Sequence, residues 1–380
     1  MKVGFFCNEY PPRPHGGIGT FVGMLAQALV KAGHAVTVVQ LGSQASYESV
    51  NGVRVVTLKE SHIKHIAWLI NRIRLWQWLR GVARAGDIEI FEIPEFQGYL
   101  PFPVRGCPVV VRLHLAQSYV EDTMNSGSAR WQIYWLEKLT LFWHPRWIAV
   151  SRYILHETRH FFAIEPTKAQ VIYNPGPTIV HEDLPELFNR PARYVVYVGS
   201  VSERKGAILL AKAMTELFTV YPDVSLVYVG PETEFRGAPI SKTIGAIVGE
   251  SNLARVHFTG RLSREYALAW LSDALVLAFV SRVESFGLVA VEAMSLGVPV
   301  IFGNCGPGPE VITNDVDGIL VDLDSQEELE IAICSILDAP DRARKMAQAG
   351  RSKLNTCFAE RSCVAQSLEF YRYTVDFFAK

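Results

Sequence analysis

Short apolar runs alternate with amphipathic segments along almost the whole chain, and this alternation restricts the fold more than any other feature. Short apolar runs are typical of buried strands, and apolar residues spaced three and four apart are typical of helices. Strands are expected at residues 3–6, 36–40, 53–58, 88–91, 109–113, 147–150 and 170–173, and again at 194–198, 225–229, 256–259, 275–280, 299–302 and 319–321. Strand–helix alternation of this kind predicts parallel βαβ units and therefore an α/β fold.

The alternation stops between residues 174 and 192, a stretch that is rich in proline. We interpret it as a linker, because such breaks commonly separate domains. A chain of 380 residues also suits two domains better than one core. The sequence therefore predicts two Rossmann-like, doubly wound domains at 1–180 and 181–361, followed by a last segment at 362–380. Ligands of such sheets bind beyond the carboxyl ends of the strands, so we expect the chemistry in loops that face a central cleft.

Composition excludes several classes of function. The net charge of -1 argues against a general electrostatic attraction to nucleic acid. No two of the six cysteines have CxxC spacing, so we expect free thiols in a reducing compartment and no zinc site. No secretory signal is apparent, and no apolar stretch is long enough to span a membrane. We therefore expect a cytoplasmic protein, and peripheral contact with the inner membrane surface stays open.

The first candidate ligand loop is rich in glycine and opens the first predicted helix, with the sequence Gly16-Gly17-Ile18-Gly19. Glycines let a ligand approach the backbone, and a helix N-terminus favours an anion such as a diphosphate. Two other interpretations stay open. A dinucleotide fingerprint would need a glycine at Val22 and a shorter distance from the strand. A plain turn that binds no ligand would also accommodate these glycines.

The second candidate follows the first strand of the second domain, where Arg204 and Lys205 precede Gly206 and a helix. Two cations at this place are well suited to neutralise a diphosphate. The alternative is a pair of solvated side chains. Cations near a helix N-terminus oppose the helix dipole unless an anion is present, which disfavours that alternative.

The third candidate is a pair of carboxylates. Glu284 follows the strand at 275–280, and Glu292 lies two helical turns further on, roughly on the same face. A carboxylate can accept two hydrogen bonds from a vicinal diol, which a ribose or a hexose offers. Glu292 also lies among apolar residues, where a carboxylate usually needs partners. From spacing alone, a surface glutamate and a capping glutamate explain the pair equally well.

The fourth candidate is His114, which directly follows the strand at 109–113 and should therefore face the cleft. On position alone, a structural histidine is slightly favoured over a functional one. The polar segment at 117–129 behind it is interpreted as a mobile loop that covers an acceptor.

A predicted helix at 63–85 interleaves cations with tryptophans, namely Lys64, Arg72, Arg74, Arg80 and Arg84 with Trp68, Trp76 and Trp78. The pattern suits an anionic membrane surface, although tryptophans packed on the sheet explain it as well. Two acidic pairs, Asp315 with Asp317 and Asp322 with Asp324, imitate a metal-binding DxD motif. Neither pair follows a long buried strand, so we expect no metal.

Taken in order, these motifs resemble the family 4 retaining glycosyltransferases, which have the two-domain GT-B fold. The resemblance spans nearly the whole chain, and it is the order of the motifs that makes it specific. It rests on Gly16-Gly17, Val150-Ser151, Asn174-Pro175, Lys205-Gly206, the E-x7-E signature from Glu284 to Glu292 with Phe286-Gly287 inside it, and Gly306-x-x-Pro309-Glu310.

The resemblance implies a role for each matching position. Gly16, Gly17, Arg204 and Lys205 would hold the diphosphate, Glu292 the ribose, and Glu284 with the amides near Phe286, Gly287 and Leu288 the donor sugar and phosphate. Arg261 and Leu262 would border the base. His114 would lie beside the transferred sugar, so His114, Lys205 and Glu284 are the expected catalytic residues. The helix at 362–378 would return to the first domain.

The implied reaction is the transfer of a glycosyl group, with retained configuration, from a UDP- or GDP-linked sugar. The acceptor would be a saccharide, a lipid-linked or a small molecule, and no cofactor would be needed. Two positions depart from the family pattern, because Ser200 stands in place of a usual arginine and Pro307 in place of a frequent glycine. Ser200 leaves room for a catalytically weak binding module. The broken fingerprint disfavours a Rossmann-type oxidoreductase or epimerase.

Overall fold

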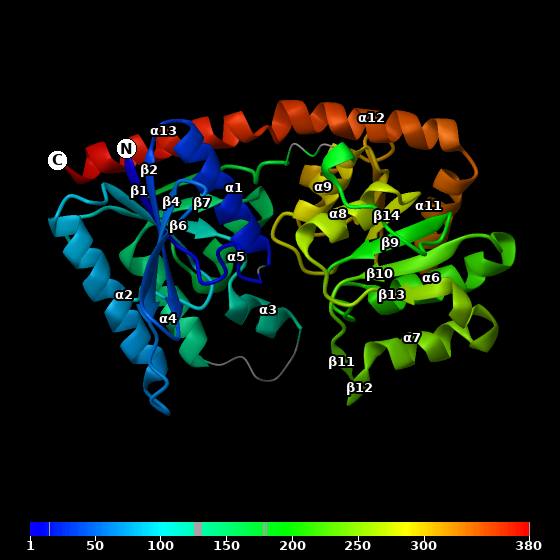
Figure 1. Ribbon diagram of the computed structural model, residues 1–380, viewed down its shortest axis with the longest axis horizontal. Helices are drawn as coiled ribbons and strands as arrows, with labels where there is room; N and C mark the ends of the chain where they lie inside the picture. Colours follow the sequence, from blue (N-terminus) through cyan, green and yellow to red (C-terminus); the bar gives the residue numbers. More distant parts are fainter. Residues whose placement is uncertain (15, 125–130, 178, 180, 380) are drawn as a thin grey trace. The chain divides into compact units, whose positions relative to one another are not determined.

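The computed structural model describes residues 1–14, 16–124, 131–177, 179 and 181–379. These residues form two compact units (Figure 1). The first unit comprises Met1–Pro175 and Glu360–Lys380, and the second comprises Gly176–Ala359. Each unit contains a largely parallel sheet with helices, which confirms the predicted α/β class.

The first unit contains an eight-stranded sheet in the order β3-β4-β2-β1-β5-β6-β7-β8. All neighbouring strands are parallel except β3 and β4, which form an antiparallel hairpin. The order reverses between β1 and β5, so the loops after these two strands flank the switch point of the sheet. The strands are β1 (Lys2–Phe6), β2 (Ala35–Gly42), β3 (Ser46–Val50), β4 (Val53–Lys59), β5 (Ile90–Pro94), β6 (Val109–Leu113), β7 (Arg146–Ala149) and β8 (Lys168–Val171).

The helices of the first unit are α1 (Gly17–Lys31), α2 (Ala67–Arg84), α3 (Gln117–Thr123), α4 (Trp131–Trp143), α5 (Arg152–Phe162) and α13 (Glu360–Phe378). α13 lies beside α1 (Figure 1). Its residues Leu368 and Tyr371 join Phe21 and Leu25 of α1 in one buried core. The last helix of the chain is therefore part of the first unit.

A buried ionic cluster ties α13 to the middle of the first sheet. Arg112 on β6 is fully buried and donates two hydrogen bonds to Glu92 on β5, at 2.7 and 2.9 Å. The hydroxyl of Tyr371 donates to Glu92 Oε2 at 2.6 Å, and Ser367 Oγ lies 3.2 Å from Arg112 Nη2. Buried charges need such partners. The hydrogen bonds of Tyr371 and Ser367 therefore fix α13 at a specific place on the first sheet.

The second unit contains a six-stranded, fully parallel sheet in the order β13-β10-β9-β14-β15-β16. In this order the direction of strand succession reverses between β9 and β14, which marks the switch point. The strands are β9 (Tyr194–Val198), β10 (Ser225–Val229), β13 (Val256–Phe258), β14 (Val276–Phe279), β15 (Val300–Gly303) and β16 (Ile319–Val321), with a separate small hairpin of β11 (Glu234–Phe235) and β12 (Ala238–Pro239).

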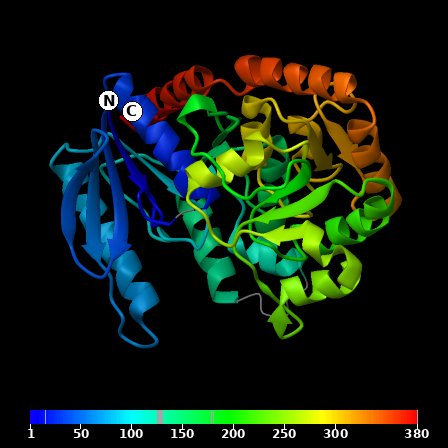
Figure 2. The same cartoon turned by 45° about the vertical axis from the view of Figure 1, so that its right-hand side comes forward.

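Helices cover the second sheet as in a doubly wound fold (Figure 2). One group, α6, α7 and α11, packs together over the larger apolar core. The other group contains α8, α9 and α12, with α9 in contact with both of the others. Their bounds are α6 (Ala207–Val220), α7 (Ile240–Val248), α8 (Arg264–Ser272), α9 (Leu288–Leu296), α10 (Gly308–Val311), α11 (Gln326–Leu337) and α12 (Pro340–Cys357).

Several boundaries differ from those that the sequence predicts. The second unit begins at Gly176 rather than 181, because the Gly176 amide donates to the Phe358 carbonyl at 2.8 Å inside that unit. It ends at Ala359, and α13 begins at Glu360 rather than 362. α2 begins at Ala67, so residues 63–66 are not helical. β3 was not predicted, because its side chains are polar and exposed. All six cysteines are free thiols.

Candidate active site

The loops after β9 and β14 lie at the switch point of the second sheet, where ligands of doubly wound folds bind. Lys205 from the first loop is ion-paired through Nζ with Oε1 of Glu284 from the second loop. The two side chains are 21% and 11% exposed, so the pair is largely shielded from solvent. Two of the residues predicted to be catalytic are thus in contact, although they are 79 positions apart in the sequence.

Close packing of these two loops explains how the pair forms. Gly206 has φ +80°, and a Cβ on it would lie 2.1 Å from the carbonyl oxygen of Val280. The Arg282 amide donates to the Arg204 carbonyl at 3.0 Å, which joins the loops through their backbones. The guanidinium of Arg204 donates to the carbonyl of Val283 at 3.3 Å. Arg204 therefore places a second cation beside the backbone that carries Glu284.

Ser200, the position where an arginine was expected, contributes its backbone to this loop. Its carbonyl accepts a hydrogen bond from the hydroxyl of Tyr197 at 2.7 Å. Position 200 therefore supplies no positive charge, and the guanidinium of Arg204, four residues later in the same loop, does.

Glu292 lies in the middle of α9 and is 8% exposed. Its partner is Arg264, the first residue of α8, which the sequence analysis did not single out. Both Nε and Nη2 of Arg264 donate to the same oxygen, Oε1, at 3.2 and 2.7 Å. Oε2 is therefore left outside this ion pair. A cation at a helix start opposes the helix dipole, and that signal, applied earlier to Lys205, would have found Arg264 as well.

The other predicted donor residues lie at the start of α9 and before α8. Phe286 is buried, Gly287 occupies the N-cap position of α9 with φ +94°, and Leu288 is the first helical residue. The N-cap residue Gly287 has no side chain with which to cap this helix, and the amides of a helix N-terminus favour an anion. Arg261 is exposed and Leu262 half-buried in the loop between β13 and α8.

In the first unit, the glycine loop is occupied by a side chain of the protein itself. The amides of Gly16 and Gly19 donate to the carboxylate of Glu9, at 3.0 and 2.8 Å. Gly17 is the first residue of α1, so Glu9 satisfies the helix N-terminus as a bound anion would. Sequence reasoning missed Glu9, which lies three residues after the end of β1 at Phe6. His15 lies outside the described residues.

His114 follows β6 and is 8% exposed, with its ring 5.1 Å from the ring of Phe21. Burial, reinforced by the charge of Arg112, lowers the pKa of His114 to about 3, so the imidazole is neutral near neutral pH. Among the described residues, none hydrogen-bonds the ring nitrogens of His114. Of the segment 117–129, residues Gln117–Thr123 form α3, and 125–130 lie outside the described residues.

Part of the cation–tryptophan pattern in the predicted helix at 63–85 has a structural explanation. Arg72 is buried and donates to the carbonyls of Gly98 and Trp68, at 2.8 Å each. The indole N–H of Trp76 donates to the Pro103 carbonyl at 3.0 Å. These side chains hold α2 to the protein, in agreement with the alternative of packed tryptophans.

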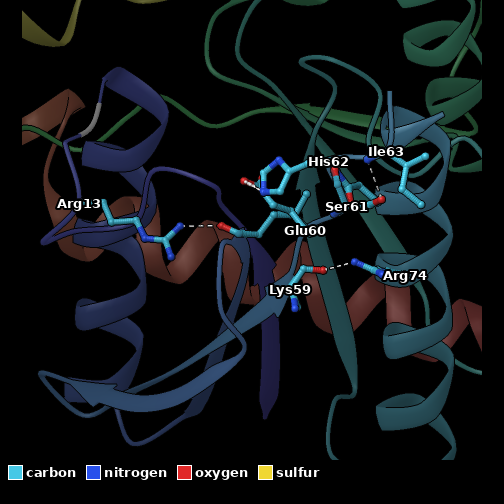
Figure 3. Close-up of polar contacts among 9 residues, drawn as sticks. Arg13, Lys59, Glu60, Ser61, His62, Ile63 and Arg74 are labelled. Atoms are coloured by element: carbon cyan, nitrogen blue, oxygen red, sulfur yellow. Dashed lines mark hydrogen bonds and ion pairs between the residues drawn. The ribbon is translucent and has the colours of Figure 1, made fainter. Parts of the chain in front are cut away.

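The segment from Ile63 to Trp68, which leads into the start of α2, is different because its apolar side chains are exposed. Ile63, Ile66 and Trp68 are 58%, 48% and 44% exposed. Figure 3 shows the turn that leads to them, in which Arg74 of α2 donates to the Lys59 carbonyl. In the same turn the Ile63 amide lies 3.4 Å from Ser61 Oγ.

Three of the four carboxylates that imitate DxD are engaged in ion pairs of their own. Asp317 is bonded to Lys353 at 3.0 Å, Asp315 to Arg342 and Asp324 to Arg282, each at 2.7 Å. Neighbouring cations compete with a metal for these carboxylates. No cluster of three or more potential metal ligands occurs within the described residues.

α5 carries a further pattern that sequence reasoning did not single out, with His156, Glu157 and His160 spaced as in zinc peptidases. The two imidazoles are exposed and stack at a centroid distance of 4.0 Å. His160 Nδ1 is bonded to the His156 carbonyl at 2.9 Å. A peptidase site needs a third ligand, and the described part of the chain provides none near this pair.

Comparisons with known proteins agree with this arrangement. Residues 183–353 match the family described as "Glycosyl transferases group 1", and residues 15–177 match "Glycosyltransferase Family 4". An uncharacterized glycosyltransferase of Methanocaldococcus jannaschii is 25% identical over 84% of this chain and 85% of its own length.

Two solved structures illustrate the fold. Sucrose-phosphate synthase of Thermosynechococcus elongatus has a TM-score of 0.80 at 22% identity, covering 100% of this chain and 99% of its own. HepE of Anabaena in complex with UDP-glucose has a TM-score of 0.70 at 17% identity, covering 97% and 98%. These likenesses establish the GT-B fold class. Since the two family matches together extend over nearly the whole chain, the protein belongs to the family 4 glycosyltransferases.

Proposed function

We propose that the protein transfers a hexosyl group from a UDP- or GDP-linked sugar to a saccharide, lipid-linked or small-molecule acceptor, with retention of configuration. The proposal rests on two ion pairs in the second unit, one between Lys205 and Glu284 and the other between Arg264 and Glu292. They combine cations for a diphosphate with carboxylates for sugar hydroxyls at one end of one sheet.

The division of labour follows from these contacts. Lys205, Arg204 and the N-terminal amides of α9 would stabilise the leaving diphosphate, which is the largest catalytic contribution expected for such a reaction. Oε2 of Glu292, outside its ion pair, would accept from the ribose hydroxyls. The neutral ring of His114 would donate or accept a hydrogen bond at the transferred sugar. None of these steps requires a metal.

Retention without a covalent intermediate is favoured by the state of the two carboxylates. Glu284 and Glu292 each form an ion pair with a cation, and the proposal assigns their oxygens to hydroxyls of the donor, so neither is assigned as a nucleophile. The acceptor would therefore attack from the face that the diphosphate leaves. That HepE binds UDP-glucose agrees with a nucleotide-sugar donor for the present chain.

The proposal is tested by incubating the purified protein with a panel of UDP- and GDP-sugars and candidate acceptors, and by assigning the anomer of the first product by proton NMR. Transfer with retention is expected for one donor. Lys205→Ala should abolish turnover, and Lys205→Arg should keep part of it because it preserves the charge. An inverted product would refute the stereochemistry, and an active Lys205→Ala variant would refute the site.

We also propose peripheral contact with an anionic membrane through the segment from Ile63 to Trp68, which leads into α2. Ile63, Ile66 and Trp68 are exposed next to the cation Lys64, a combination that suits the interface of an anionic bilayer. No helix among the described residues has the length and apolarity to cross a bilayer.

Co-sedimentation with vesicles tests this contact. Binding to vesicles that contain phosphatidylglycerol should exceed binding to pure phosphatidylcholine, and Ile66→Ser with Trp68→Ser should abolish the difference. Tyr47→Ser is the matched control, because Tyr47 is 68% exposed on β3 in the same unit but lies outside this segment. Equal sedimentation of all variants would refute the contact.

A further inference from the structure

Two buried carboxylates hold the backbone that carries His114. Glu95 directly follows β5 and is fully buried. Its Oε1 accepts hydrogen bonds from the amides of His114 and Leu115, at 2.8 and 2.6 Å, and its Oε2 lies 2.9 Å from the His114 amide. The loops after β5 and β6, which are neighbouring strands, are thus joined through one side chain.

Leu115 shows that this loop is held in an unfavourable shape. Its φ is +101°, a conformation that L-residues with bulky side chains rarely adopt. Backbone conformations of this kind persist only where the surroundings enforce them, and they concentrate at functional sites. The bond from the Leu115 amide to Glu95 is one such restraint, and it acts on the residue directly after His114.

Glu137 on α4 restrains the next part of the same loop. Its Oε1 accepts from the amides of Gln97 and Gln117, at 2.9 and 2.8 Å. Its Oε2 accepts from the amide of Ser118 at 3.1 Å and from the Ser118 hydroxyl. A single carboxylate therefore fastens the loop after β5, the start of α3 and helix α4 to one another.

Burying two acids without a counter-ion is an expensive way to hold a loop. Within the described residues neither Glu95 nor Glu137 forms an ion pair, and the nearby Arg72 donates to backbone carbonyls. Burial raises the pKa of Glu95 to about 8, against the opposing effect of hydrogen bonds from the amides of His114, Leu115 and Glu95 itself. Burial also raises the pKa of Glu137. Apolar packing would secure an ordinary loop at a smaller cost. The arrangement therefore points to a required geometry at His114.

We propose that Glu95 and Glu137 are positioning residues that fix the backbone from His114 to Ser118, and through it the imidazole of His114, for glycosyl transfer. The inference rests on the proposed function, because it assigns His114 to the transferred sugar. It predicts that both acids act on the chemical step and leave donor binding to the second unit unchanged.

The two acids should respond differently to the same conservative change. Oε1 of Glu95 accepts from both amides, and Oε2 lies near the His114 amide only. The carbonyl oxygen of a glutamine can take the place of Oε1, so Glu95→Gln loses only the second contact to the His114 amide. Glu95→Gln should therefore keep kcat within about threefold, whereas Glu95→Ala should lower kcat by about 100-fold, the effect of a displaced catalytic group. Glu137 uses both oxygens, so Glu137→Gln should already lower kcat by about 10-fold. The KM for the donor should change less than twofold in all three variants.

Tyr371→Phe is the control for a purely structural effect. It removes a buried hydrogen bond to Glu92 in the same sheet but touches neither acid nor the loop, so it should lower stability and leave kcat unchanged. A fall of kcat in Tyr371→Phe equal to that in Glu95→Ala would overturn the inference, as would an unaltered kcat in Glu95→Ala.

Hydrogen exchange separates this inference from the proposed function, since it needs no turnover. In the full-length wild-type protein, the amides of residues 114, 115, 117 and 118 should be protected from exchange. In Glu95→Ala the amides of residues 114 and 115 should exchange rapidly, and in Glu137→Gln those of residues 117 and 118. Slow exchange at these amides in the variants would overturn the inference. If the variants lose protection as expected but the wild-type protein transfers no sugar, the proposed function is refuted and this inference about the loop is not.

Discussion

Gly287, at the start of α9, is the position where the structure makes the sharpest quantitative prediction. Its φ is +94°, and a Cβ there would lie 2.8 Å from the ring of Phe302 and 3.1 Å from that of Phe279. Alanine in a left-handed conformation costs about 1–2 kcal/mol, and overpacking of a core adds about 1–3 kcal/mol. We therefore expect Gly287→Ala to reduce the free energy of unfolding of the second unit by about 2–5 kcal/mol.

Gly297 provides the matched control at the other end of the same helix. Its φ is +73°, but a Cβ would meet its nearest neighbour, the guanidinium of Arg351, at 3.6 Å. Gly297→Ala thus carries the conformational cost alone, about 1–2 kcal/mol. It should also leave turnover unchanged, whereas Gly287→Ala should lower it because the amides at the start of α9 shift.

The assay must report on the second unit. Of the eight tryptophans only Trp270 lies there, so intrinsic fluorescence chiefly follows the first unit. Native-state hydrogen exchange of peptides from β14, β15 and α9 measures the local free energy of opening instead. If Gly297→Ala destabilised these peptides as much as Gly287→Ala, the steric part of the reasoning would be refuted.

Three further predictions concern Glu292, His114 and the buried ionic cluster of the first unit. Glu292→Gln should lower kcat/KM by about 10- to 100-fold, since hydrogen bonds to a charged group contribute about 1.5–3 kcal/mol, and unchanged kinetics would remove Glu292 from the donor site. The pKa of His114 is lower in the folded protein than the value of 6.5 expected for the unfolded chain. Between these two pKa values the unfolded chain binds a proton that the folded protein does not bind, so the free energy of unfolding should fall as the pH drops from about 6.5 toward 3. Urea unfolding of the first unit at several pH values should show this fall and its loss in His114→Gln. Tyr371→Phe should destabilise the first unit by about 1.5–3 kcal/mol in the same fluorescence-detected titration, because Glu92 loses one of its buried donors.

The sequence was sufficient to predict the strands that line both switch points, because these strands are short, apolar and regularly spaced. It also drew attention to Lys205 and Glu284, which the fold brings into contact. It could not place the hairpin strand β3, whose exposed polar side chains carry no alternating pattern. Nor could it place the boundary at Gly176, which depends on packing against residues almost two hundred positions away.

The residues that complete the site were missed for a common physical reason. Glu9, Glu95 and Glu137 act through hydrogen bonds from backbone amides. A carboxylate that accepts hydrogen bonds from backbone amides has no basic side chain as its partner, so no pair of opposite charges in the sequence indicates it. Only the three-dimensional structure shows that Glu95 and Glu137 are buried, and their burial is what distinguishes them from ordinary surface acids.

The division of the first unit into two pieces has a consequence for how the protein is made. A ribosome releases residues 176–359 before α13, so the second unit is complete while the first still lacks its last helix. Until Tyr371 emerges, Glu92 and Arg112 lack one of their buried partners, and the apolar face of α1 stays partly uncovered. The N-terminal unit should thus be the last to reach its final form during synthesis, and a chain terminated near residue 359 should depend on chaperones.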